Sequence, residues 1–143
     1  MKLALLEAEK SYRLSEVPVG SIITMGDRII ASSHNRTIND NDPTSHAEIN
    51  AIRKASKKMG NYRLTGTTMY VTLEPCSMCY GAIIHARISR LVFGAYDTKT
   101  GVCGSSVNLL EQIFFNHTPE IKGGVLEKDC SSILKQFFQD KRN

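Results

Sequence analysis

Two short motifs place a set of metal-binding side chains at two separate points of this 143-residue chain. The first motif is His-Ala-Glu at residues 46–48, and the second is Pro-Cys-Ser-Met-Cys at residues 75–79. Imidazole and thiolate are common zinc ligands, and a zinc ion with three protein ligands keeps one position open for water, as catalytic sites do. His46, Cys76 and Cys79 therefore predict one catalytic zinc ion in the chain. Any fold of this sequence must bring the two motifs together.

Glu48, the carboxylate of the first motif, is left over once the three ligands are assigned. Residues two apart lie about 200° apart around a helix, so Glu48 and His46 diverge in a helix interior and converge only at its first turn. At that position Glu48 suits a general acid–base that moves protons between water at the metal, a ring nitrogen and a departing amine. The alternative for Glu48 is a solvated carboxylate that complements the helix dipole. The combined pattern, H-x-E and then P-C-x-x-C, is the signature of zinc-dependent nucleobase deaminases.

A Cys-x-x-Cys pair by itself also fits a redox motif or one half of a zinc ribbon. A ribbon requires a second closely spaced pair, and the two remaining cysteines, Cys103 and Cys130, are isolated from each other. In a reducing compartment isolated cysteines are most often small buried apolar residues. We therefore favour a catalytic zinc site over a structural one.

The length of the chain predicts one domain that covers residues 1–143. The apolar start of the chain is interrupted by Glu7, Glu9 and Lys10, which indicates an amphipathic helix rather than a signal peptide. No apolar run approaches the length of about twenty residues that a membrane span needs, so we expect a cytoplasmic protein with no membrane segment. The net charge of +4 permits an anionic partner such as RNA without requiring one.

Helical and strand-like patterns alternate along the chain. We expect helices over 3–13, 45–59, 76–86, 107–112 and 127–141, and strands over 19–25, 29–33, 68–73, 91–95 and 121–124. The first two strands are separated by a short turn at 26–28 and read as a hairpin, and residues 35–44 are polar loop. This order predicts an α/β layered sheet with parallel pairing after the opening hairpin.

Nearly the whole chain, from about Ala4 to Phe138, resembles the bacterial tRNA adenosine deaminases of the cytidine deaminase-like superfamily. The resemblance is carried by the segments 16–20, 34–36, 42–48, 61–64, 70–76, 85–88 and 92–101. Superfamily members that act on free bases share the zinc elements but usually not this whole series. Ser45, Tyr80 and Tyr96 depart from common family usage, and Tyr80 takes the place of a small residue.

The resemblance implies a three-layer α/β/α fold with a five-stranded mixed central sheet and helices on both faces. It implies hydrolytic deamination of the wobble adenosine of a tRNA anticodon, typically of an arginine tRNA, to inosine. Family members are homodimers, so a second copy of the chain and the anticodon stem-loop are the expected partners. The site residues that the resemblance implies are zinc ligands at His46, Cys76 and Cys79, a proton-transfer residue at Glu48, and substrate contacts at Asn35, the backbone of Ala47, Asp97, Lys99 and Phe138.

The residues alone leave several alternatives open. Asn35 also fits a turn-forming position at the end of a strand. Phe137 and Phe138 fit either base stacking or a helix core, and Lys141 and Arg142 fit either phosphate contact or a solvated tail. The basic run at 53–58 is more typical of a solvated helix face than of a binding surface.

Two other functions compete with tRNA editing. The same zinc chemistry would serve a small-molecule nucleobase or nucleotide deaminase of the guanine or cytosine type. A non-catalytic zinc-containing binding subunit is the other alternative. Such subunits in this superfamily often lack the proton-shuttling glutamate, and Glu48 is present in this chain.

Overall fold

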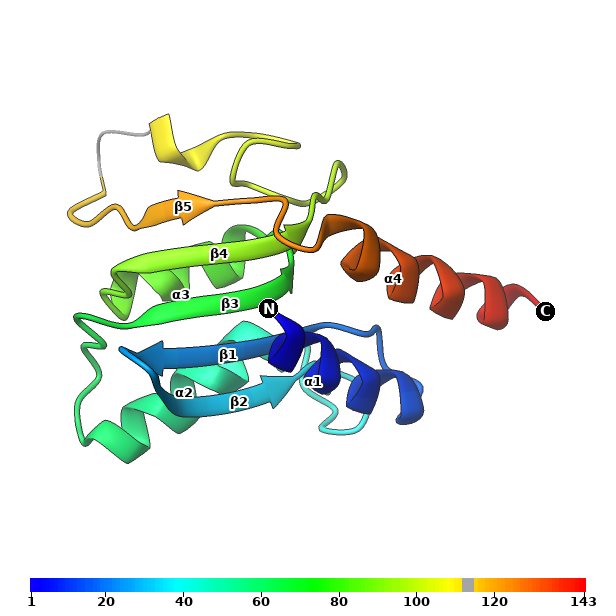
Figure 1. The fold of residues 1–143 in the computed structure, drawn as a ribbon, viewed down its shortest axis with the longest axis horizontal. Coiled ribbons are helices and arrows are strands. Elements are labelled where there is room, and N and C mark those ends of the chain that lie inside the picture. The colour runs from blue at the N-terminus through cyan, green and yellow to red at the C-terminus, as the bar shows by residue number, and fades with distance from the viewer. Residues whose placement is uncertain (112–114) are drawn as a thin grey trace.

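A mixed five-stranded sheet forms the centre of the molecule (Figure 1). The computed structural model describes residues 1–111 and 115–143. Its elements, in chain order, are α1 (Lys2–Arg13), β1 (Gly20–Met25), β2 (Arg28–His34), α2 (Ala47–Met59), β3 (Thr68–Leu73), α3 (Ser77–His85), β4 (Arg90–Ala95), the 3₁₀ turn η1 (Leu109–Glu111), β5 (Glu120–Lys122) and α4 (Glu127–Arg142). The strand order is β2-β1-β3-β4-β5. The strand β1 is antiparallel to β2 and β3, and β3, β4 and β5 run parallel, as expected.

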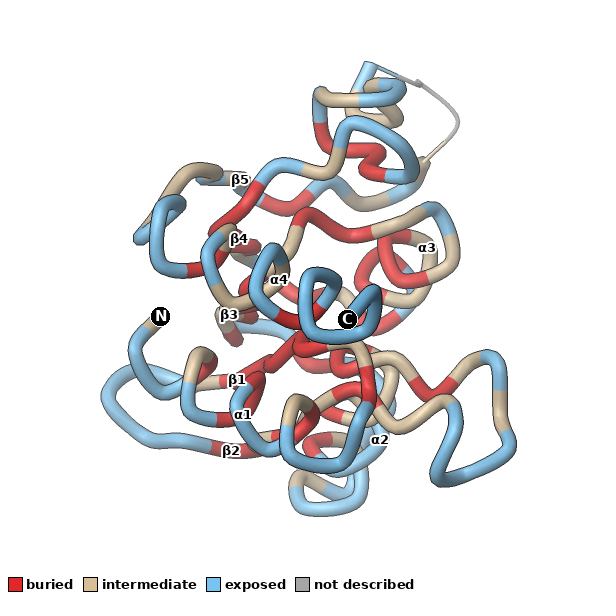
Figure 2. Tube along the Cα trace, turned by 90° about the vertical axis from the view of Figure 1, so that its right-hand side faces the viewer, coloured by how far each residue is buried: buried red, intermediate tan, exposed pale blue. Residues whose placement is uncertain are grey.

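The helices form one layer on each face of the sheet. The helix α2 packs against β1, β2 and α3 on one face, while α1 packs against β1 and β2, and α4 against β4, on the other. This confirms the three-layer α/β/α architecture. Figure 2 shows the buried residues along the strands and on the inner sides of the helices. Among the described residues, no helix has the length and apolar character needed to cross a membrane.

The main apolar core lies between the sheet and the α2–α3 layer. The helix α2 contributes Ala47, Ala51 and Ala55, which are fully buried. These small side chains recur along one face of the helix, so its backbone lies close to the sheet. On the opposite face, a Cβ atom at Gly20 would lie 1.9 Å from the backbone oxygen of Ala4, so α1 requires a glycine here. Both helical layers are therefore held close to β1 by small residues.

Two expected elements are shorter than the sequence pattern indicates. The predicted helix at 107–112 is only the turn Leu109–Glu111, and residue 112 lies outside the described residues. The predicted strand at 121–124 is Glu120–Lys122. It ends there because Gly123 lies against the ring of Phe93 and Gly124 has a left-handed backbone with φ of 79°. Apolar pattern alone does not reveal such a local backbone constraint.

Tyr80, which takes the place of a small residue, lies in the apolar core on α3. Its ring packs edge-to-face on Phe115 with centroids 5.9 Å apart, and the residue is fully buried. Its hydroxyl has no hydrogen-bond partner among the described residues, and burial raises the pKa of Tyr80 to about 12.

We expect Tyr80→Phe to raise the free energy of unfolding by about 1 kcal/mol, because the variant removes a buried hydroxyl that forms no hydrogen bond. Chemical denaturation measures the change. Tyr62→Phe is the matched control, since Tyr62 is 68% exposed. The control should change stability by less than about 0.5 kcal/mol. A loss of stability in Tyr80→Phe would show that the hydroxyl has a partner after all.

Candidate active site

The three predicted metal ligands meet at the N-termini of two neighbouring helices. His46 is the N-cap of α2, Cys76 is the N-cap of α3, and Cys79 lies in the first turn of α3. The Nδ1 atom of His46 is 3.8 Å from the Sγ atom of Cys76 and 3.4 Å from that of Cys79. All three donor atoms lie within 4.8 Å of one another. A tetrahedral zinc ion with ordinary bond lengths separates a nitrogen from a sulfur ligand by roughly 3.6 Å, so the donor set fits zinc.

The electrostatics of the cluster favour a thiolate. Hydrogen bonding with the Cys79 thiol and with His46 lowers the pKa of Cys76 to about 4. The same interaction with Cys76, together with burial, raises the pKa of Cys79. Hydrogen bonding with Cys76 raises the pKa of His46. The positive ends of α2 and α3 lie at the same point, so the site combines a soft anionic ligand with two further donors.

Glu48 occupies the second position of α2 and is 4% exposed. Burial raises the pKa of Glu48 to about 7, and the positive charge of nearby His46 acts in the opposite direction. The carboxylate is not one of the three clustered donors, yet it lines the same cavity as His46 and Cys76. The first-turn arrangement predicted for this motif is therefore present, and the solvated-surface alternative for Glu48 is wrong.

The cavity at the cluster has a volume of about 200 Å³. Its walls are lined by Val17, Val19, Asn35, His46, Glu48, Leu73, Glu74, Cys76, Asp97 and Thr100. The three apolar residues of this wall, Glu74 and Thr100 had no role predicted from the sequence. They lie within the segments that carry the family resemblance. That resemblance was the only feature of the sequence that pointed to them. Their side chains bear no metal-binding pattern, so chemistry alone did not single them out.

Asn35 presents a free side-chain amide to this cavity. Its backbone N–H donates to the oxygen of Val19 at 3.0 Å, and its backbone oxygen accepts the hydroxyl of Ser11 at 2.8 Å. The side chain is 7% exposed and makes no hydrogen bond to the described residues. The amide thus forms no local turn and keeps both its donor and its acceptor. Ala47 is buried at the first position of α2, where a backbone N–H has no acceptor within the helix.

Glu16 holds the loop that connects Asn35 to His46. The fully buried carboxylate accepts the backbone N–H of Asn39 at 2.7 Å, its side-chain amide at 2.9 Å and the hydroxyl of Thr37 at 3.2 Å. Burial opposes ionisation, but these hydrogen bonds outweigh it and lower the pKa of Glu16 below 4.5. The carboxylate therefore favours the folded protein only while it is ionised.

We expect this contribution to disappear in acid. The folded pKa lies below the unfolded value of 4.5, so the unfolded chain binds more protons as the pH falls from 4.5 through the folded pKa. The melting temperature should fall over that range and should depend less on pH in Glu16→Gln than in the unsubstituted protein. Thermal melts at a series of pH values measure the difference. Equal acid sensitivity of the two proteins would contradict this role for Glu16.

Asp97 and Lys99 lie on a loop beside the cavity. The carboxylate of Asp97 accepts the backbone N–H groups of Lys99 at 3.0 Å and Thr100 at 3.1 Å, and the hydroxyl of Thr100 at 2.7 Å. Although burial opposes ionisation, the bonds with Thr100 and Lys99 lower the pKa of Asp97. The carboxylate of Asp97 thus stabilises its own loop and also lines the cavity. Direct contact of Asp97 and Lys99 with RNA stays a prediction.

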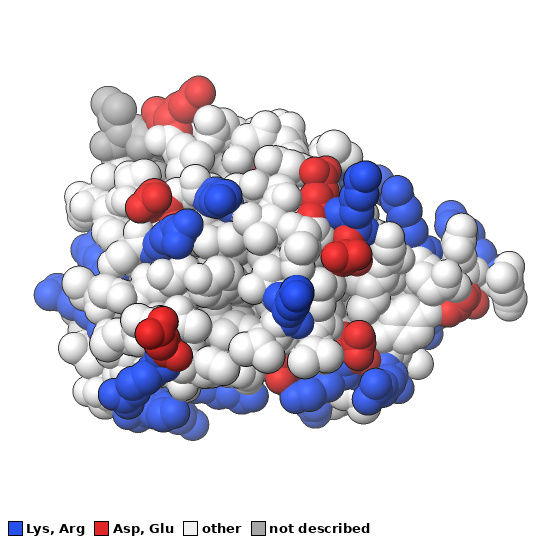
Figure 3. All heavy atoms as spheres, in the orientation of Figure 1, with Lys and Arg blue, Asp and Glu red and all other residues white. Residues whose placement is uncertain are grey.

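A second concave surface, the basic groove, joins the loop to the last helix. It has a volume of about 520 Å³ and is lined by Lys99, Leu134, Lys135, Phe138, Gln139, Lys141 and Arg142. Phe138 is 48% exposed, whereas Phe137 is 6% exposed and packs edge-to-face on Tyr12 with centroids 5.6 Å apart. Only Phe138 of the two is therefore available to a ligand. Figure 3 shows Lys and Arg side chains along one edge of α4, with Asp and Glu side chains beside them.

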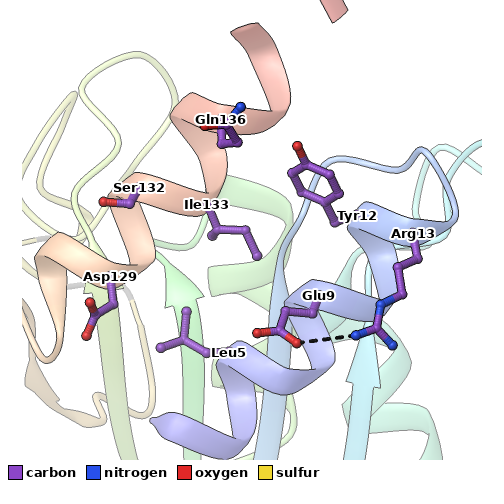
Figure 4. Close-up of a pocket in the computed structure, with 8 residues that line it drawn as sticks. All are labelled: Leu5, Glu9, Tyr12, Arg13, Asp129, Ser132, Ile133 and Gln136. Atoms are coloured by element: carbon purple, nitrogen blue, oxygen red, sulfur yellow. Dashed lines mark ion pairs between the residues drawn. The ribbon is translucent and has the colours of Figure 1, made fainter. Parts of the chain in front are cut away.

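A further groove lies between α1 and α4, on the face of the sheet that these two helices cover (Figure 4). It has a volume of about 530 Å³ and is lined by Leu5, Glu9, Tyr12, Arg13, Asp129, Ser132, Ile133 and Gln136. Glu9 and Arg13 form an ion pair with a nitrogen–oxygen distance of 3.7 Å. The lining contains no histidine or cysteine, so this larger groove does not offer the metal chemistry of the smaller cavity.

Comparison with known proteins connects this geometry to a family. The family model described as MafB19-like deaminase matches residues 1–142. The chain is 50% identical over 143 residues to a tRNA-specific adenosine deaminase of Haemophilus influenzae, covering 99% of this chain and 83% of the relative. The chain belongs to the family of tRNA-specific adenosine deaminases. The three clustered donor residues, Glu48 and the cavity thus form the candidate active site of a deaminase.

Two solved structures show how the family fold is shared. A structure from a study of A-to-I editing by tRNA:A34 deaminases at the wobble position matches with a TM-score of 0.91 at 46% identity, covering 94% of this chain and 97% of that one. A guanine deaminase from Bacillus subtilis matches with a TM-score of 0.65 at 32% identity, covering 99% of this chain and 90% of that one. The first of these structures confirms the expected fold class. The second shows the same fold in a protein whose name gives a free base, guanine, as its substrate.

Proposed function

We propose that this deaminase converts the wobble adenosine of a tRNA anticodon, in an arginine tRNA, to inosine. The observation that carries the proposal is the small cavity, which is lined by two of the three clustered donors, His46 and Cys76, by the buried carboxylate of Glu48 and by Asn35. The basic groove beside it supplies an aromatic face and four cationic side chains for the surrounding RNA. The net reaction consumes adenosine and water and releases inosine and ammonia.

His46, Cys76 and Cys79 would hold zinc, one ion per subunit. When bound, zinc would lower the pKa of a water molecule toward about 7 and so supply a nucleophile for C6 of adenine near neutral pH. Glu48 would take one proton from the attacking water and deliver it to N1 of the ring. It would then take the second proton from the new hydroxyl on C6 and deliver it to the departing amine, which leaves as ammonia. The amide of Asn35 and the backbone N–H of Ala47 hold the base, and the apolar side chains of Val17, Val19 and Leu73 exclude water from its faces.

The RNA contacts follow from the shape of the anticodon loop. Bases in such a loop are already unpaired, so placing one of them in the cavity costs less than extruding a base from a duplex. Phe138 suits stacking with a neighbouring base, and Lys99, Lys141 and Arg142 suit contact with phosphates. Asp97 lines the cavity and would contact a nucleotide that flanks the target base.

The deciding experiment offers the purified protein an arginine tRNA anticodon stem-loop and, separately, guanine, cytosine and free adenosine. We expect inosine in the stem-loop, abolished by a chelator and restored by zinc. Deamination of the free bases alone would establish the small-molecule alternative. Zinc binding without any deamination would establish the non-catalytic alternative, against which the buried position of Glu48 argues.

We also propose that residues 1–143 form one deaminase domain that acts as a homodimer in the cytoplasm, where tRNA is available. Support comes from the family match over residues 1–142 and from the single sheet that joins all five strands. Light scattering should give twice the mass of the chain, and a monomeric mass would contradict the dimer.

A further inference from the structure

Glu74 is a buried acid that the proposed reaction does not use. It is 2% exposed and lies between the end of β3 and the second metal motif, two residues before Cys76. Its Oε2 atom accepts the backbone N–H of Asp97 at 3.1 Å, and its Oε1 atom accepts that of Ser105 at 3.2 Å. One carboxylate therefore binds both ends of the loop 97–105.

The loop is closely packed around this carboxylate. A Cβ atom at Gly101 would lie 1.8 Å from Oε2 of Glu74, so only glycine fits at the middle of the loop. The backbone N–H of Val102 donates to the oxygen of Pro75 at 3.1 Å, which adds a third bond between the loop and the metal motif. Among the described residues, no ion pair within 4 Å involves Glu74. Its two buried oxygens therefore accept backbone N–H groups of the loop and not a cationic side chain.

The loop that Glu74 holds carries the candidate substrate contacts of this side of the site. Asp97 and Thr100 line the catalytic cavity, and Lys99 lines the basic groove. The same segment that presents the ligand Cys76 thus also determines where these three side chains lie. A change at Glu74 would move the loop relative to the metal donors without removing a donor or the proton-transfer residue.

We propose that Glu74 is a positioning residue that holds loop 97–105 against the metal motif and thereby determines the affinity for the nucleotides that flank the target base. The inference rests on the proposed function, because it takes those nucleotides to be RNA. It separates two parts of the enzyme. The three metal-ligand residues and Glu48 serve the reaction itself. Glu74 acts on substrate affinity through the loop.

Glu74→Gln tests this directly, because glutamine keeps the shape of the side chain but replaces one acceptor oxygen by an NH₂ group that faces an N–H. We expect full zinc content, faster amide hydrogen exchange in 97–105, and a KM for the stem-loop raised about tenfold with kcat within about twofold. Lys99→Ala should raise KM in the unsubstituted protein and much less in Glu74→Gln, because the loop that places Lys99 is already displaced.

Glu16→Gln is the matched control, since Glu16 is also a buried glutamate that holds a loop through backbone and side-chain donors. It should accelerate exchange near Asn39 and leave exchange in 97–105 unchanged. Gly101→Ala is the second variant and displaces the loop with the carboxylate intact, so a folding defect of Glu74→Gln does not end the test. It should raise KM in the same way.

The outcomes separate the two proposals. An unsubstituted protein that leaves the stem-loop unmodified overturns the proposed function, and with it the flanking-nucleotide role. If the unsubstituted protein edits the stem-loop, a fall in kcat with unchanged KM, a loss of zinc, or an undiminished effect of Lys99→Ala in Glu74→Gln overturns the role of Glu74 alone.

Discussion

Glu48→Ala is expected to lower the turnover of an anticodon stem-loop by about 1,000-fold while the protein keeps its zinc. The carboxylate lines the cavity with His46 and Cys76 but is not one of the three clustered donors. Removing it leaves the metal ligands in place and takes away the group that moves protons between water, ring and leaving amine. Single-turnover inosine formation and metal analysis of the same sample measure the two properties separately.

Glu48→Gln is the stricter form of this experiment, because it preserves the shape of the buried side chain and removes only its ability to accept and return a proton. It should be as inactive as Glu48→Ala. Glu120→Gln, at an exposed glutamate of β5, controls for the loss of one negative charge and should retain full activity. Appreciable turnover by either Glu48 variant would show that another group transfers the protons.

The second large effect is expected from Cys79→Ala, which should lose bound zinc, lose deamination and melt at a lower temperature. Cys79 is fully buried, and its sulfur is 3.4 Å from the imidazole of His46. With two ligands left, the site no longer resembles a stable zinc site. Metal binding that occurs only in the folded protein stabilises it, so loss of the ion and loss of stability are expected together.

Cys130→Ala provides the matched control for this loss. Cys130 is also fully buried, but it lies in α4 against β4, and it is not one of the clustered donors. The variant should lose about 1 kcal/mol of stability through the small cavity that it leaves, and it should keep zinc and activity. A Cys79→Ala protein with its full zinc content would refute the ligand assignment, whatever its activity.

The ligands and Glu48 could be predicted from the sequence because their chemistry and spacing are local properties. His46 and Cys76 each occupy the N-cap position of a helix without a capping hydrogen bond of their own, so their metal-ligand chemistry and not a capping pattern made them recognisable. Glu74 could not be predicted in the same way, since its partners are the backbone N–H groups of Asp97 and Ser105, which carry no side-chain signal. Phe137 and Phe138 are adjacent on one helix, and only the position of Tyr12 on α1 decides which of them is buried.

The buried alanines of α2 have no reactive group, but the position of two active-site residues depends on them. Ala51 and Ala55 are fully buried where the helix lies close to the sheet, and the same helix begins at His46 and Glu48. A larger side chain at either alanine would tilt the helix and carry both of those residues away from the cysteines. The geometry of the active site therefore also depends on these two distant methyl groups. A screen of random variants should find them as intolerant of change as the active site itself.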